Sequence, residues 1–257
     1  PRPSVACCGR SAEARARSMQ IRLHPACLAL LAMTLAPSAQ AQRYTASVGA
    51  ASDYVLHGVS RSLSGPVLQG DLAFQVGNRW SLGVSASTMN LNPGPGPSRE
   101  LGLWAGGSRA LGRDWSLAGS VYAWRYAAQI PGLPYDYEEL RLELGWRERL
   151  RLGLAVAPDY SVRTRVGVAY EATSLDLSLG LQQPLSRAWS LTAGLGHFEV
   201  GGALDRGYLY WSAGLLFTGS RLSASLGYAG SQDETRIMFG SRSTGDRVIA
   251  TVSLRLH

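Results

Sequence analysis

The sequence has no lysine, and its cysteines stop early. Cys7, Cys8 and Cys27 are all it contains, so the chain after residue 27 can form neither a disulfide nor a thiolate metal site. Apolar runs are short: the ten residues from Cys27 to Ala36 fall below the about 20 that a transmembrane helix needs. The basic residues are all arginines scattered among carboxylates, which is unfavourable for a nucleic-acid-binding protein.

The N-terminal region has the features of an export signal. Arg22 supplies positive charge, the run to Ala36 is a short apolar segment, and Ala39-Gln40-Ala41 is a small-x-small cleavage site. We therefore expect residues 1–18 to be an upstream extension, residues 19–41 a signal peptide and residues 42–257 the mature, exported chain. That mature chain keeps 20 basic and 17 acidic residues, a net charge of +3.

Similar segments recur along the mature chain. They begin at Tyr44, Trp80, Trp115, Leu150, Trp189 and Leu222, at spacings of 36, 35, 35, 39 and 33 residues. Propeller blades and helical repeats also give periods of about this size. Apolar and polar residues alternate within each segment, as in ELRLELGW at 139–146, which indicates strands and excludes helical repeats. A propeller blade packs four short strands into one period, whereas each period here holds two strands of about 11 residues.

The connections between these strands alternate between short polar turns and longer links rich in glycine and proline. Six successive hairpins predict an all-β fold: twelve antiparallel strands forming an up-and-down transmembrane β-barrel, with short periplasmic turns and long extracellular loops. A tilted strand of about 11 residues rises roughly 27 Å, which fits an apolar band about 25 Å tall. The strand count can shift by two, because the phase is ambiguous in 101–111 and changes near Ala172, where we expect a bulge or an extended loop ribbon.

Aromatic residues recur at one level of the predicted sheet. Trp80, Trp115 and Trp189 each follow a short turn on the outward phase, Tyr44 begins the first strand there, and Trp146 ends a strand at the same level. Because such rings favour the boundary between hydrocarbon and headgroups, these residues predict an aromatic girdle. The alternative is a soluble β-sandwich with tryptophans in its core. The alternating long links and the charges of both signs on inward positions favour the barrel.

Residues 52–74, SDYVLHGVSRSLSGPVLQGDLAF, resemble the opening signature of the TorF family of outer-membrane proteins, which are assigned as porins. The matching positions are Ser52, Asp53, Tyr54, Gly58, Ser60, Pro66, Gln69 and Gly70. APDY at 157–160 is similar to a second element of that family, and the order of hairpins agrees over the whole mature chain. His57 stands where the family has arginine, and His257 where such barrels usually end in an aromatic residue. The resemblance implies a barrel with a pore.

The first hairpin places polar residues near the expected extracellular mouth. By the phase of Tyr44, Asp53 faces the lumen, and Gln69 and Asp71 face it from the paired strand. With Arg61 in the loop between them, carboxylate–guanidinium and amide hydrogen bonds would fold the loop inward and constrict the pore. The alternative, and the commoner arrangement in proteins, is that these residues only pin the hairpin.

Charged residues also occupy inward positions further along. Glu139, Arg141 and Glu143 lie on one predicted strand, opposite Arg151 on the next. Such a ladder biases ion passage in an open pore. The same charges can equally pair with one another and plug a narrow barrel, so both alternatives stay open.

The sequence therefore predicts a porin of the Gram-negative outer membrane for passive diffusion of small solutes, with neither catalysis nor a cofactor or metal. The alternatives are a narrow, plugged barrel with a structural or adhesion role, and a lipid esterase. His197 has the outward phase that a lipid-facing catalytic histidine needs, but no partner serine accompanies it. Membrane lipid is the expected partner, and association into homo-oligomers stays open. Arginines at the loop ends suit lipopolysaccharide phosphates, with solvated loop charge as the alternative; they are Arg125, Arg163, Arg165, Arg206, Arg236 and Arg242.

Overall fold

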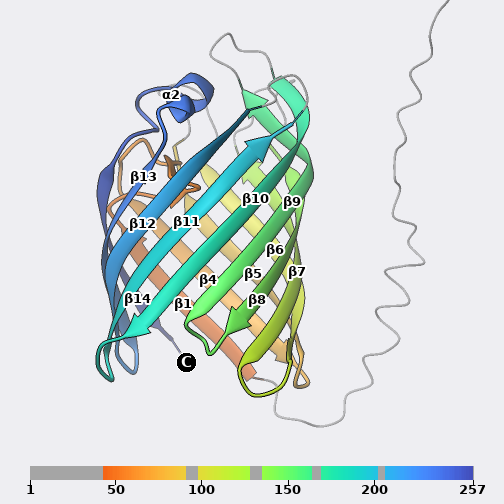
Figure 1. Ribbon diagram of the computed structural model, residues 1–257, viewed down its shortest axis with the longest axis vertical. Helices are drawn as coiled ribbons and strands as arrows, with labels where there is room; N and C mark the ends of the chain where they lie inside the picture. The colour runs from red at the N-terminus through yellow and green to blue at the C-terminus, as the bar shows by residue number, and fades with distance from the viewer. Residues whose placement is uncertain (1–42, 91–97, 128–134, 164–168, 202–205, 257) are drawn as a thin grey trace, which may run out of the picture. The chain divides into compact units, whose positions relative to one another are not determined.

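The computed structural model describes residues 43–90, 98–127, 135–163, 169–201 and 206–256. These residues form a closed antiparallel barrel of twelve strands, which confirms the predicted fold (Figure 1). Sequential strands are neighbours around the barrel, and the last strand pairs with the first. The strands are β1 (Arg43–Ala51), β4 (Val67–Val76), β5 (Trp80–Thr88), β6 (Arg99–Ala110), β7 (Trp115–Ala127), β8 (Tyr137–Trp146), β9 (Leu150–Arg163), β10 (Ala169–Pro184), β11 (Trp189–Val200), β12 (Arg206–Thr218), β13 (Leu222–Ser231) and β14 (Arg247–Arg255).

Short turns join the strands at one end of the barrel, here called the short-turn end, and longer links join them at the other, the long-loop end (Figure 1). In the three-residue link between β8 and β9, Arg147 and Glu148 have φ angles of 50° and 57°, and Arg149 N–H donates to Trp146 O at 2.9 Å, as in a type I′ turn. Arg147 Nε donates a hydrogen bond of 3.0 Å to Asp114 Oδ1 in the neighbouring turn. The short-turn end is therefore built from tight, mutually braced hairpins.

The outer surface of the barrel is apolar. At alternate positions, Leu140, Leu177 and Val252 are 48%, 50% and 50% exposed. The residues between them face inward, where Glu139 and Asp176 are each 7% exposed. A soluble protein places its apolar side chains inside, so this arrangement is the one expected of a wall that contacts lipid.

Both segments of ambiguous phase form strands in the structure. In β6, Leu101 and Leu103 are exposed on the outside, while Trp104 faces inward and stacks on Tyr122 of β7. In β10, the pairing with β9 shifts register between Ala172 and Ser174. The bulge expected near Ala172 is thereby confirmed, and it lets a long two-stranded ribbon continue beyond it.

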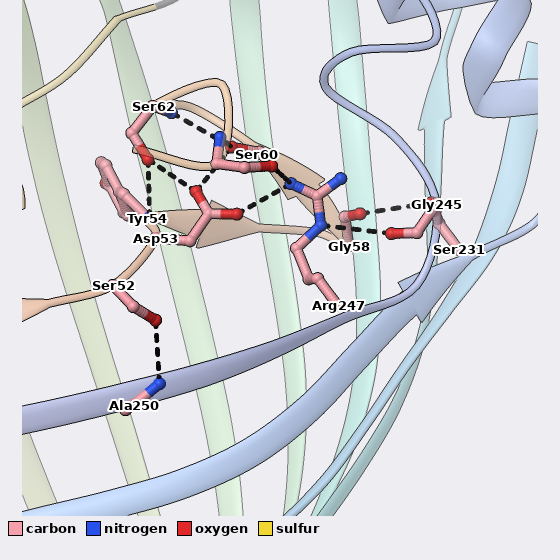
Figure 2. Close-up of polar contacts among 11 residues, drawn as sticks. Ser52, Asp53, Tyr54, Gly58, Ser60, Ser62, Ser231, Gly245, Arg247 and Ala250 are labelled. Atoms are coloured by element: carbon pink, nitrogen blue, oxygen red, sulfur yellow. Dashed lines mark hydrogen bonds and ion pairs between the residues drawn. The ribbon is translucent and has the colours of Figure 1, made fainter. Parts of the chain in front are cut away.

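The barrel closes between β1 and β14 over a short seam. Five residue pairs join these strands, ending at Ala51↔Thr251, whereas nine join β1 to β4. Beyond Ala51 the chain leaves the wall. Ser52 makes the last contacts, since its N–H donates to Ala250 O at 2.9 Å and its Oγ accepts from Ala250 N–H at 3.0 Å (Figure 2).

Three further elements were not expected from the sequence. β2 (Val55–Leu56) and β3 (Val59–Ser60) form a two-stranded sheet of their own within the link between β1 and β4. α2 (Glu234–Phe239) lies in the link between β13 and β14 at the long-loop end (Figure 1). Among the described residues, no helix is long and apolar enough to span a membrane.

Candidate functional site in the barrel lumen

The link between β1 and β4 folds into the lumen as a hairpin. We call residues 52–66 the inner hairpin. Its turn is made by His57 and Gly58, whose φ angles of 49° and 73° again suit a type I′ turn. Glycine is required at 58, because a Cβ there would lie 2.7 Å from Gly230 O and 2.8 Å from the Tyr210 Cβ. The tip therefore packs against β12 and β13, which are separated from β1 by β14 in the barrel wall.

Asp53 holds one side of the inner hairpin. It accepts hydrogen bonds from Ser60 Oγ at 2.6 Å and Ser62 Oγ at 2.5 Å, and its other oxygen accepts from Arg247 Nη1 of β14 at 2.8 Å (Figure 2). The Asp53 side chain is only 5% exposed. One carboxylate thus fixes the hairpin's own fold and joins it to the barrel wall.

Arg61 holds the opposite side. Its Nη1 donates to Glu100 Oε2 of β6 at 2.6 Å and to the Tyr126 hydroxyl of β7 at 2.7 Å. Tyr54, from the same hairpin, donates its hydroxyl to the other Glu100 oxygen at 2.7 Å. Burial raises the pKa of Tyr54, which keeps this hydroxyl protonated as a donor. Glu100 is 4% exposed, so its charge is balanced by protein groups rather than water.

The tip of the hairpin lies on aromatic side chains. The His57 ring stacks on Phe198 of β11, with centroids 4.5 Å apart and planes 18° apart, and its Nε2 is 3.8 Å from Asp176 Oδ1. Burial, with smaller contributions from Arg61 and Arg141, lowers the pKa of His57 to about 3, so the ring is neutral. With these contacts the inner hairpin touches wall strands on all sides of the lumen.

A belt of aromatic side chains lines the lumen around the inner hairpin. Its members are Trp104, Tyr122, Trp124, Tyr126, Tyr137, Tyr160, Phe198, Tyr208 and Phe239. Some rings lie flat along the wall over glycines: a Cβ on Gly102 would lie 2.6 Å from the Trp124 ring. Sequence reasoning missed the belt, although the alternation of Tyr122, Trp124 and Tyr126 on the inward phase of β7 carries its signal.

Below the belt, toward the short-turn end, the inward positions carry small residues. They include Ser81, Ser85, Ser116, Ser120, Ser178, Thr192, Ser212, Ser223, Ser225 and Ser253. A cavity of about 340 Å³ lies directly beneath the hairpin tip, between His57 and the wall residues Glu139, Arg141, Glu143 and Asp176. That volume is within the range of small-molecule sites, about 300–1,000 Å³.

The predicted charge ladder borders this cavity. Arg141 pairs with Glu139 and lies 4.2 Å above the centre of the Tyr122 ring. Glu143 has no ion-pair partner within the described part of the chain and is exposed. Arg151 is opposite Gly145, not opposite the three charged residues of β8, because the register of β8 and β9 places it nearer the short-turn end. The ladder is thus an ion pair plus two separate charges.

The first-hairpin residues are arranged differently from the expectation. The carboxylate partner of Arg61 is Glu100 of β6, and Asp53 pairs with Arg247 of β14, because the hairpin turns into the lumen and directs the two residues to strands on either side of the β1–β4 pair. Gln69 and Asp71 are opposite Gly49 and Ser47 in the β1–β4 ladder. Asp71 lines a second cavity of about 260 Å³ at the short-turn end, together with residues of β1, β12, β13 and β14.

The predicted girdle residues lie at the short-turn end of the barrel. Tyr44, Trp80, Trp115 and Trp189 are between 47% and 64% exposed on the outer surface. Trp146 is opposite Trp115 and is partly covered by Arg147, whose guanidinium carbon is 5.0 Å from the ring centre.

The other outward-facing candidates are at the long-loop end. Arg125 already pairs with Glu138 at 2.7 Å, and Arg236 with Asp233 at 3.4 Å. Arg165 and the Arg163 side chain lie outside the described residues. His197 faces outward and is exposed, and its partners in the adjacent strands are Leu177 and Leu209, which cannot act as nucleophiles.

Comparison with known proteins identifies a family and a fold. The family model described as "Bacterial protein of unknown function (Gcw_chp)" matches residues 36–256. A comparison with curated proteins finds no match. The solved NanC porin superposes with a TM-score of 0.54 at 9% identity, covering 81% of this chain and 98% of that one. The KdgM porin, solved with disordered oligogalacturonate, has a TM-score of 0.48 at 8% identity, covering 84% and 100%. LpxR from Salmonella typhimurium has a TM-score of 0.43 at 8% identity, covering 82% and 99%. At these identities the likeness to NanC shows the outer-membrane barrel fold.

Proposed function

The chain belongs to the Gcw_chp family of bacterial proteins of unknown function, and we propose that this member is an outer-membrane channel for small solutes, constricted by its inner hairpin. The resemblance of residues 52–74 to the TorF signature agrees with this proposal. In the outer membrane the short-turn end of the barrel would face the periplasm, and the long-loop end would face the outside of the cell. Tyr44, Trp80, Trp115, Trp146 and Trp189 then form the periplasmic girdle.

The observation that carries the proposal is the contrast between the two halves of the lumen. The long-loop half is filled by the inner hairpin and the aromatic belt, whereas most inward positions toward the short-turn end carry serine, threonine, glycine or alanine, with Asp71, Glu143 and Arg151 among them. A barrel that served only as a support would fill its interior with large side chains. Small polar side chains instead leave room for water and a solute. The constriction and the chamber below it are the parts of a selective diffusion channel.

The residues along the path have different roles in the proposed channel. Arg61 and Asp53 hold the constriction in place, and Glu139, Arg141 and Glu143 border the chamber beneath it. Asp71 and Arg151 lie further toward the periplasmic mouth, with Gln69 on the same wall. Because Arg141 neutralises Glu139, the exposed Glu143 dominates the charge at this level, which favours small cations over anions.

The test is the conductance of the refolded mature chain in planar bilayers, beside a variant without the hairpin. Ala51 and Val67 are already paired across β1 and β4, so replacing residues 53–65 by Asn-Gly closes the link and leaves every strand of the barrel intact. We expect small, steady conductance from the native chain and at least several-fold more from this shortened chain. A shortened chain that folds as a barrel and does not conduct would refute the channel.

A plugged barrel with a structural role is the second candidate, because both ion pairs of the inner hairpin are buried. It predicts no conductance from the native chain under any condition. Reproducible conductance from the native chain would exclude it.

A further inference from the structure

The barrel does not depend on the inner hairpin for its closure. β1 pairs with β4 up to Ala51↔Val67 and with β14 up to Ala51↔Thr251, and both ladders end where the hairpin begins. Within the described ranges, β2 and β3 pair with each other and with no strand of the wall. Removing the hairpin from the lumen would therefore break no ladder hydrogen bond of the barrel.

Besides the packing of its tip on aromatic side chains, a small set of polar contacts holds the hairpin. Two are ion pairs, Arg61–Glu100 and Asp53–Arg247, with side chains between 3% and 10% exposed. Apart from Ser52 at the base, which bonds to Ala250 of β14, its backbone hydrogen bonds to the rest of the protein run to loops: Ser60 N–H donates to Ser243 O at 2.7 Å, and Asn90 N–H donates to Arg61 O at 2.8 Å. At the tip, Ser231 Oγ donates to Gly58 O at 3.2 Å.

The hairpin backbone is also conformationally unfavourable. Besides Gly58, three residues without glycine's freedom have positive φ: His57 at 49°, Leu63 at 54° and Ser64 at 61°. Such residues persist where surrounding contacts hold them. This backbone strain favours release of the hairpin from the lumen once the polar contacts are lost. The absence of ladder hydrogen bonds between β2 or β3 and the wall favours it too.

We propose that the inner hairpin is a displaceable plug, latched by the Arg61–Glu100 and Asp53–Arg247 ion pairs, whose release opens the channel. This inference rests on the proposed channel function. The hinge is at Ser52 and Pro66, where the chain leaves β1 and enters β4. We take Arg61–Glu100 as the principal latch, because the Tyr54 and Tyr126 hydroxyls also bond to it. Loss of one partner leaves a buried charge, whereas loss of both removes the charges together.

A double-mutant cycle on this latch tests the proposal. Since the chain after Cys27 has no cysteine, Val59→Cys, on the buried face of the hairpin, supplies a single thiol whose labelling reports displacement. In that background, Arg61→Met and Glu100→Met should each speed labelling by roughly 100-fold and raise channel conductance, because each strands a buried charge. The double variant should return to within about tenfold of the parent. Arg125→Met, which breaks an exposed pair on the outer surface, is the matched control and should change neither.

The outcomes separate the plug from the channel. Equal labelling in all four chains of the cycle would overturn the latch, as would a double variant labelled as fast as the single ones. Loss of the folded barrel's mobility on unheated gels in the single variants would show a structural hairpin and overturn the plug. Faster labelling of the single latch variants with no conductance, together with a hairpin-free chain that also does not conduct, would refute the channel function while the displacement stands. If the hairpin-free chain conducts but the latch variants show no faster labelling, the plug alone is refuted.

Discussion

Gly58→Ala measures how tightly the inner hairpin is seated. A residue with φ of 73° costs an alanine about 1 kcal/mol relative to glycine. The new Cβ would also lie 2.7 Å from Gly230 O and 2.8 Å from Ser231 Cβ, and overpacking of this kind costs about 1–3 kcal/mol. The seated state should therefore lose about 2–4 kcal/mol relative to the displaced state, which shifts the ratio of the two by roughly 30-fold or more.

Trypsin provides the assay, because Arg61 is the only arginine within the inner hairpin, which has no lysine, and it is 8% exposed when the hairpin is seated. The release of a fragment ending at Arg61 follows the displaced population when opening is fast relative to cleavage. Gly77→Ala is the matched control. Its φ of 63° carries a similar backbone cost, but nothing lies within 4 Å of the new Cβ, and the residue is in a turn at the short-turn end. Equal cleavage at Arg61 in both variants would refute the close seating of the tip.

Three further changes have defined outcomes. Burial lowers the pKa of His57 to about 3, whereas an exposed imidazole titrates near 6.5, so the displaced state gains a proton first as the pH falls. Cleavage at Arg61 should therefore be constant above about pH 6.5 and rise by up to tenfold per pH unit below it. His57→Asn should remove that part of the slope. Leu226→Arg, on the outer face of β13, should lower the unfolding free energy in lipid vesicles by about 2–4 kcal/mol, while Ser225→Arg, facing the lumen, should change it by less than 1 kcal/mol; equal losses would mean that the outer face does not meet hydrocarbon. Replacing Arg141 and Arg151 by Glu should move the reversal potential toward cation preference in planar bilayers, and unchanged selectivity would remove both residues from the path.

The wall of the barrel could be predicted from the sequence because its signal is local. Alternation along each strand fixes which side chains face outward, and the change of phase at Ala172 marks the bulge that the pairing of β9 and β10 contains. The tryptophans after the short turns could be placed at one level for the same reason. Each of these features depends on residues within one or two strands of each other.

The interior could not be predicted in the same way. Alternation stops after Ala51, and residues 57–65 carry only the signals of a turn, so the sequence does not say whether the link points outward or inward. Arg61 meets Glu100 from 39 positions away, and Asp53 meets Arg247 from 194 away. Such partners become neighbours only through the curvature of the closed barrel, which no local pattern encodes. The sequence therefore placed Arg61 beside the nearest carboxylates instead.

The pairing of Asp53 with Arg247 also sets an order of assembly. Asp53 follows β1, the first strand of the barrel, and Arg247 begins β14, the last. The contact therefore cannot form until β14 has paired with β1. A partly assembled chain leaves that carboxylate and its neighbours exposed to water and to proteases. Closure of the barrel buries these groups, so the Asp53–Arg247 ion pair forms only in fully assembled barrels.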